Sequence, residues 1–68
     1  MLYSNLKAEM ARRGITNRDL AQAIGKREEA VSRKMTGKSD FTVFEASTIK
    51  KAFSIDVPIE QLFFKTEG

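Results

Sequence analysis

Residues 16–37 read TNRDLAQAIGKREEAVSRKMTG, and this stretch decides the fold. Thr16 is followed three residues later by Asp19, which is the pattern of a capping box with aspartate in place of the usual glutamate. The pattern predicts a short helix that ends at Gly25, with its apolar side chains on one face: Leu20, Ala21 and Ile24. A second helical pattern begins at residue 27 or 28, continues to residue 35 and is closed by Gly37.

The two predicted helices are separated by a single glycine, a spacing that few small structures need. Ala21 is small enough for the two helices to approach closely, and Gly25 tolerates the positive φ that the turn needs. Val31 and Met35, at i and i+4, form the apolar pair of the later helix. The spacing predicts a helix-turn-helix over about residues 16–37, a motif whose second helix can enter the DNA major groove.

Three further helices are predicted around this unit. One carries an apolar stripe of Leu2, Leu6 and Met10 and ends at Gly14. Another opens with a capping box at Thr42 and Glu45; its inward positions are Phe44, Thr48, Ile49, Ala52 and Phe53, with Lys50 and Lys51 outward. A short last helix starts at Val57 and Pro58 and turns Leu62 and Phe63 inward. The expected fold is therefore an all-α, compact five-helix domain that spans residues 1–68.

The phenylalanines are expected to form core contacts. Helical spacing places Phe41, Phe44, Phe53 and Phe63 inside. Phe64 follows Phe63 directly, and two adjacent side chains of one helix cannot both point inward. Phe64 is then either a dimer contact or a loose end.

Composition argues against an enzyme. The 68 residues include no cysteine and no histidine, which removes disulfides, thiolate ligands and the commonest general base. We expect no catalytic residue, no metal, no cofactor and no small-molecule ligand. The sequence contains no apolar run of membrane-spanning length, and its start lacks the order of a signal peptide. We therefore expect a cytoplasmic protein with no membrane partner.

The basic residues are concentrated on the proposed motif. The chain carries twelve Lys and Arg against nine Asp and Glu, a net charge of +3. Five cations (Lys26, Arg27, Arg33, Lys34 and Lys38) and two anions (Glu28 and Glu29) lie within residues 26–38, which alone gives +3. The excess is located where phosphate neutralisation would require it.

The motif resembles the Cro and phage lambda-repressor class of helix-turn-helix proteins, often called XRE-like. The similarity rests on Gly-Ile-Thr-Asn-x-Asp-Leu-Ala-x-x-Ile-Gly at residues 14–25, on Val-Ser-Arg at residues 31–33 and on Gly-Lys at residues 37–38. It implies a DNA-binding transcriptional regulator from a phage or mobile element, a repressor that binds a short palindromic operator as a homodimer. Base contacts are expected from Glu28, Glu29, Ser32 and Arg33. Phosphate contacts are expected from Thr16, Asn17, Lys34, Thr36, Lys38 and Ser39.

Three positions depart from the family pattern. Glu28 stands where the family often has glutamine, Lys34 where it usually has a large apolar residue, and Asn17 where it commonly has glutamine. Met35 is expected to replace the packing that Lys34 lacks. Each of these residues also has an alternative role without DNA. Glu28 and Glu29 could serve only to stabilise the positive end of the helix dipole, and Arg33 and Lys34 could be ordinary solvent-exposed residues. The two glutamates keep a second function open, a protein-interaction module of antitoxin-like or anti-repressor-like type.

Overall fold

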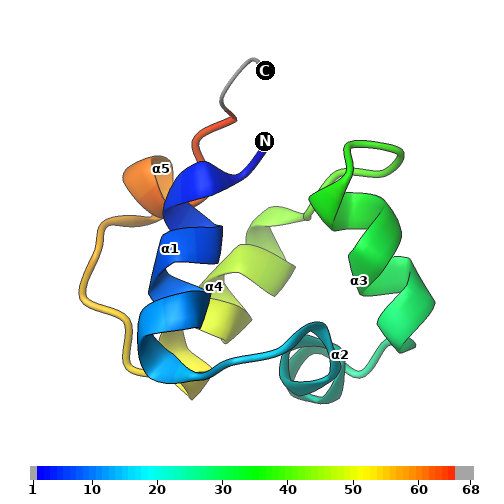
Figure 1. Cartoon of the computed structure of the whole chain (residues 1–68), viewed down its shortest axis with the longest axis horizontal. Helices are drawn as coiled ribbons and strands as arrows, with labels where there is room; N and C mark the ends of the chain where they lie inside the picture. The colour runs from blue at the N-terminus through cyan, green and yellow to red at the C-terminus, as the bar shows by residue number, and fades with distance from the viewer. Residues whose placement is uncertain (1, 66–68) are drawn as a thin grey trace.

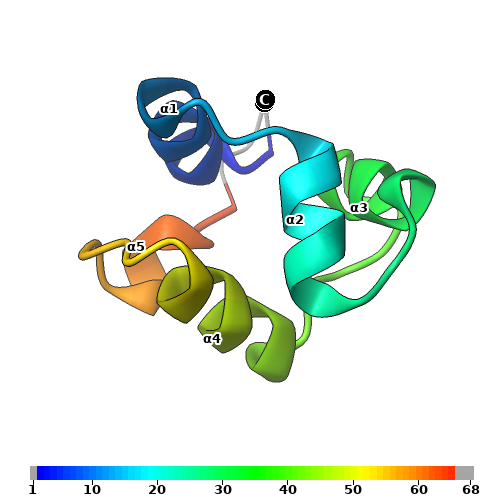
Figure 2. The ribbon, with the colours of Figure 1, turned by 90° about the horizontal axis from the view of Figure 1, so that it is seen from below.

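Five α-helices form the structure over residues 2–65, the part of the chain that this computed structural model describes (Figure 1). In chain order they are α1 (Ser4–Arg13), α2 (Asn17–Ile24), α3 (Glu28–Met35), α4 (Val43–Ala52) and α5 (Ile59–Leu62). No strand occurs among these residues, so the all-α fold class is confirmed. Figure 2 shows α2 beside α3 and above α4, and α2 packs against both helices. Contacts of α5 with α1 and α4 close the other side of the fold.

Local hydrogen bonds fix where α2 and α4 begin. The Thr16 hydroxyl accepts from the Asp19 N–H at 3.2 Å, and the Asp19 carboxylate accepts from the Thr16 N–H at 2.9 Å. Thr42 and Glu45 make the same reciprocal pair, with both distances 3.0 Å. Both predicted capping boxes are therefore present, and each satisfies N–H groups that a helix start leaves without intrahelical acceptors.

The core receives at least one fully buried side chain from every helix. These residues are Leu6, Leu20, Val31, Ile49 and Leu62, each with no exposed surface. Tyr3, Phe41 and Phe63 pack edge to face beside them, with ring centroids 5.2 to 6.2 Å apart. Aromatic pairs prefer this geometry because it brings the positive ring edge to the negative ring face.

The expected core position of Phe44 is wrong. Its side chain is 76% exposed, and that of its neighbour Val43 is 81% exposed. The buried residues of α4 include Ala46 and Ile49. Phe44 precedes Ala46 by two residues, about 200° around a helix with 3.6 residues per turn, so it lies on the far side. Ala52, also expected inside, is exposed as well.

The expectation that Lys50 points into solvent is also wrong. Its Nζ donates to the carbonyls of Ile55 at 2.7 Å and Val57 at 3.1 Å. Lys50 is in the last turn of α4, where the chain reverses toward α5 and presents carbonyls that no helix satisfies. Lys51, by contrast, is exposed as expected.

Candidate nucleic-acid interface

The turn between α2 and α3 sets the position of α3. Gly25 has φ of 69°, a left-handed conformation that costs glycine little, and its N–H caps α2 by donating to the Ala21 carbonyl. The Lys26 N–H donates to the same carbonyl at 3.0 Å. Ala21 is buried, and α2 and α3 pack closely. Val31 and Met35, the buried residues of α3, attach one face of this helix to the core.

The opposite face of α3 is open to solvent. The four side chains expected to contact bases are all exposed: Glu28, Glu29, Ser32 and Arg33. Glu29 and Arg33 lie on this face with Ser32 at its edge, whereas Glu28 is exposed at the start of the helix, three residues before Val31 and seven before Met35. Glu29 and Arg33 are four residues apart on the helix, a spacing at which opposite charges are neighbours. This face can therefore present carboxylate, hydroxyl and guanidinium groups to a partner.

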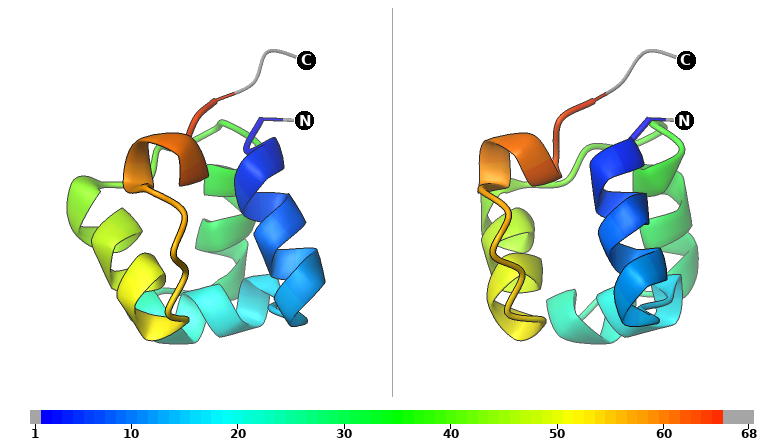
Figure 3. Two further views of the ribbon diagram at one scale, coloured as in Figure 1. Left: turned by 90° about the vertical axis from the view of Figure 1, so that its left-hand side faces the viewer. Right: turned by 60° about the vertical axis from the view of Figure 1, so that its left-hand side comes forward.

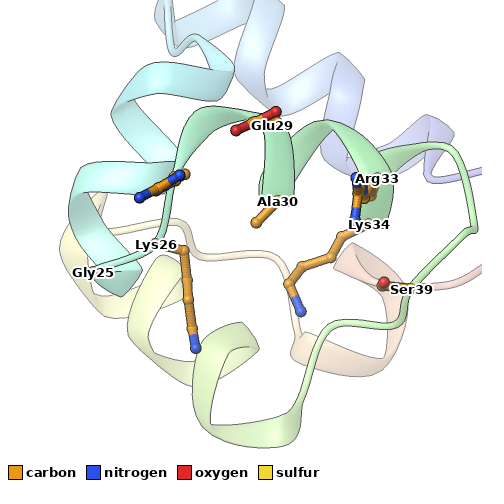
Figure 4. Close-up of a pocket in the computed structure, with 8 residues that line it drawn as sticks. Gly25, Lys26, Glu29, Ala30, Arg33, Lys34 and Ser39 are labelled. Atoms are coloured by element: carbon orange, nitrogen blue, oxygen red, sulfur yellow. The ribbon is translucent and has the colours of Figure 1, made fainter.

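A cationic hollow of about 650 Å³ borders this face. Its charged lining residues are Lys26, Arg27, Glu29, Arg33 and Lys34, and Ala30 and Ser39 complete much of the wall. Figure 4 shows Lys26 and Lys34 extending from the α3 side toward α4, with the short side chain of Ala30 between them. Four cations and one carboxylate around a single depression make it suitable for an anion.

Lys26 and Arg27 were not among the sequence-predicted site residues. Both are exposed, and both line the hollow. Arg27 is the N-cap residue of α3 and makes no side-chain cap bond, so its guanidinium is not used to start the helix. The concentration of positive charge over residues 26–38 was the signal that could have identified them.

Lys34 is engaged within the protein. Its Nζ lies 3.1 Å from Glu45 Oε1 and donates to the Asp40 carbonyl at 3.0 Å. The Lys34 side chain is 13% exposed and that of Glu45 is 7% exposed. The ammonium also lies 5.9 Å from the centroid of the Phe41 ring. Lys34 therefore ties α3 to α4 and offers little of its charge to a phosphate.

Glu45 is held in its charged form. Burial alone would raise the pKa of its carboxyl group, but the Thr42 backbone N–H and the Lys34 ammonium outweigh burial. The net result is a pKa below the ordinary value. A charged Glu45 keeps the Lys34 contact in place at neutral pH.

The remaining residues expected to contact phosphates are at the start of α2 and at or after the end of α3. The Thr16 hydroxyl is occupied by Asp19 both as acceptor and as donor, so Thr16 contributes its cap rather than a free side chain. Asn17 is the first residue of α2 and is partly exposed. The Thr36 hydroxyl donates to the Ser32 and Arg33 carbonyls, both at 3.1 Å, and so closes the end of α3.

Lys38 and Ser39 follow Thr36 and are exposed, and Ser39 reaches the cationic hollow. The structure therefore brings only some of the predicted phosphate-contacting residues together beside α3. Ser39 shares the hollow with Arg33 and Lys34, whereas Thr16 and Asn17 belong to the separate start of α2.

Within residues 2–65, no group of three His, Cys, Asp or Glu side chains is arranged to hold a metal ion. In the same part of the chain, no helix is long and apolar enough to cross a membrane. The chain matches no known family model, and comparisons with curated proteins and with solved structures find no match either.

Proposed function

We propose that residues 16–37 form a helix-turn-helix and that the protein is a sequence-specific transcriptional regulator that binds double-stranded DNA as a homodimer. One observation carries the proposal. The α3 helix is fixed to the core by Val31 and turns an exposed polar face outward, beside a hollow lined by Lys26, Arg27 and Arg33 and by Lys34, which is paired with Glu45. A helix of about 10–12 Å diameter with such a face fits the major groove, which is about 12 Å wide.

The proposed division of roles follows the chemistry of the side chains. Arg33 can donate two hydrogen bonds to guanine O6 and N7, and Glu28 or Glu29 can accept from cytosine N4. Ser32 can pair with several base edges. These four residues would read the sequence from the exposed face of α3.

Backbone contacts would come from the surroundings of α3. The structure favours adding Lys26 and Arg27 to the phosphate-contacting set and leaving Lys34 out, because Glu45 already neutralises Lys34. The Asn17 and Arg18 N–H groups at the start of α2 have no intrahelical acceptors and can donate to a phosphate, whereas the Asp19 N–H already donates to the Thr16 hydroxyl. At the end of α3 and after it, the residues that contact phosphates would be Thr36, Lys38 and Ser39.

A second function keeps one specific observation in its favour. Glu28 and Glu29 are both exposed at the start of α3, where phosphates would repel them. In an antitoxin-like or anti-repressor-like interaction module, the same two carboxylates would pair with cations of a partner protein. The two functions differ in whether the protein binds DNA at all.

Salt dependence of binding to a labelled random-sequence duplex separates these functions. If a dimer contacts roughly six to ten phosphates, affinity falls by about three to five decades between 50 and 200 mM salt. The double variant Lys26→Ala/Arg27→Ala should make the slope shallower by about 0.9 for each phosphate that the variant leaves without a cation. Lys51→Ala, which removes an exposed cation outside the interface, should leave the slope unchanged. No binding, or binding that does not vary with salt, would contradict the DNA proposal.

A further inference from the structure

The cationic hollow beside α3 is larger than a single DNA phosphate requires. Its volume of about 650 Å³ lies within the range of small-molecule sites, about 300–1,000 Å³. Its lining residues come from the α2–α3 turn, from α3 and from the loop after α3, and none of them belongs to α1 or α5. Figure 3 looks at the fold from the side of α1 and α5, and α3, in green, lies behind them. The hollow is therefore formed by one segment of the chain, residues 25–39.

Three cationic side chains that line this hollow have no ion-pair or hydrogen-bond partner within residues 2–65. They are Lys26, Arg27 and Arg33, and all three are exposed. In contrast, five other cations contact a carboxylate or a backbone carbonyl: Arg12, Arg13, Lys34, Lys50 and Lys65. Like charges that gather without counter-charges repel one another, so an anion that enters the hollow relieves this repulsion.

The charge available in the hollow suits a multivalent anion. Glu45 already neutralises Lys34. The remaining charged lining groups are three cations and the Glu29 carboxylate, so three positive charges less one negative charge leave +2. A monovalent anion would compensate only part of this charge. Two adjacent phosphate groups would compensate it fully within one small ligand, because each phosphate carries more than one negative charge.

The donors of the hollow suit phosphate groups in particular. Arg27 and Arg33 each carry a planar guanidinium, which can donate two parallel hydrogen bonds to one phosphate. Lys26 adds an ammonium and Ser39 adds a hydroxyl, and both can donate to further oxygens. The lining residues include no aromatic side chain, so none of them can stack on a base. The chemistry that the hollow can recognise is therefore the phosphate groups and not a nucleoside attached to them.

We propose that the cationic hollow binds a compact polyphosphate, either inorganic pyrophosphate or the di- or triphosphate group of a free nucleotide. The sequence alone predicts no small-molecule ligand, and only the fold gathers these side chains around one depression. Glu29 remains on the wall, where its carboxylate repels phosphates and limits their affinity. We expect a dissociation constant for pyrophosphate between about 10 μM and about 1 mM.

A bound polyphosphate would also compete with DNA, and this part of the inference rests on the proposed function. Lys26 and Arg27 are proposed to contact DNA phosphates, and Arg33 is proposed to read a base. All three side chains line the hollow. A ligand that occupies them withdraws these contacts from DNA, so DNA affinity should fall as the polyphosphate concentration rises. The hollow would then connect regulation to the supply of free polyphosphates.

Titration of the DNA-free protein with sodium pyrophosphate, up to about 10 mM and at fixed ionic strength, tests the site in a range suited to weak binding. NMR shifts should saturate and should cluster at residues 25–39. Inorganic phosphate should bind at least about fivefold more weakly, because it brings less charge to the same donors. Adenosine and guanosine triphosphates should bind within about fivefold of pyrophosphate and of each other, because the base makes no contact.

Single variants of the lining residues test which side chains hold the ligand. Lys26→Gln and Arg33→Gln each remove an exposed cation, so both should stay folded and should weaken pyrophosphate binding by about fivefold. Glu29→Gln removes the repelling carboxylate and should tighten binding by up to about fivefold. Lys51→Gln removes an exposed cation outside the hollow and should bind pyrophosphate like the wild type.

Three results of the titration would overturn the proposal: shifts that do not saturate, shifts spread over basic residues of all five helices, or equal binding of phosphate and pyrophosphate. A nucleotide that binds far more tightly than pyrophosphate would overturn the assignment to phosphate groups. Competition is measured with a labelled random-sequence duplex, and pyrophosphate should release more DNA than sodium chloride of equal ionic strength. Equal release by the two salts would overturn the regulatory part. Because the titration contains no DNA, the site can fail while salt-dependent DNA binding succeeds, and the reverse is equally visible.

Discussion

At the scale of single residues, Glu28 and Arg33 determine which donors and acceptors α3 presents to a partner. Both are exposed, and their chemistry is opposite: the guanidinium donates to acceptors, and the carboxylate accepts from donors. A guanine presents acceptors in the major groove and a cytosine presents an N4 donor. Together the two side chains can therefore read both bases of a G·C pair, the guanine through Arg33 and the cytosine through Glu28.

Glu28→Gln should change which base pair is preferred. The substitution keeps the shape of the side chain, removes one negative charge and adds a donor. We expect modestly tighter non-specific binding and a shifted preference at one base pair per half-site, toward adenine, of about 1–3 kcal/mol. Operator selection with the variant measures the shift. Glu60→Gln removes an exposed acid of α5 and should leave the preference unchanged. An unaltered sequence preference for Glu28→Gln would mean that Glu28 does not read bases.

Val31→Ala should loosen α3 from the core. Val31 has no exposed surface, so truncation removes buried methyl groups and leaves a cavity, at a cost of about 1–3 kcal/mol. A chain of this size has a stability of only a few kcal/mol, so the melting temperature should fall clearly and DNA affinity should fall with it. Thermal unfolding is the measurement, with Ser32→Ala on the exposed face as the control. Equal melting temperatures for Val31→Ala and the wild type would show that Val31 does not anchor α3.

At the scale of elements, the ion pair between Lys34 and Glu45 joins α3 to α4. Both side chains are largely buried, and Glu45 also accepts from the Thr42 N–H. Removing one member leaves the other buried without its counter-charge, which costs far more than losing both. The pair therefore links α3 to the start of α4.

A double-mutant cycle tests this ion pair. Lys34→Met should destabilise the protein by up to about 3 kcal/mol, the lower end of the range for breaking a buried pair. Lys34→Met/Glu45→Gln should recover part of that loss, and Lys51→Met should have little effect because Lys51 is exposed. Chemical unfolding measures each of these proteins, together with Glu45→Gln and the wild type. Additive effects of the two single changes would show that Lys34 and Glu45 are not coupled.

The same pair predicts a pH dependence of stability. The pKa of Glu45 is below its ordinary value of 4.5, so the unfolded chain binds this proton more readily than the folded one. The contribution of Glu45 is therefore present above pH 4.5 and is lost as the pH falls through the lowered pKa. Unfolding measured from pH 7 downward should show this loss in the wild type and a smaller one in Glu45→Gln. Identical pH profiles would contradict the assignment.

The boundaries of α2 and α4 were predictable from the sequence because their determinants are local. Thr16 and Asp19, like Thr42 and Glu45, are three residues apart, and a capping box depends on nothing further away. The partner of Lys34 was not predictable, since Glu45 follows it by eleven positions across a loop and only the packing of the fold brings them together. Phe44 was misassigned because its apolar character was weighed above the rotational phase that Ala46 and Ile49 set.

At the scale of the whole molecule, charge and apolar surface are segregated. The cationic hollow borders α3, while a second, more apolar hollow is lined by Val43 and Ala46 of α4 and by Ile59 of α5. In the proposed complex with DNA, the cationic hollow meets phosphates.

Selection of duplexes from a fully randomised pool tests the central claim most directly. The wild-type protein is mixed with the pool, and the retained duplexes are sequenced over several rounds. We expect enrichment of a palindrome whose two half-sites have centres about 10 base pairs apart, one helical turn, as two α3 helices in successive major grooves require. Arg33→Ala should lose the preference at one position of each half-site. A retained pool with the same sequence composition as the starting pool would contradict the account.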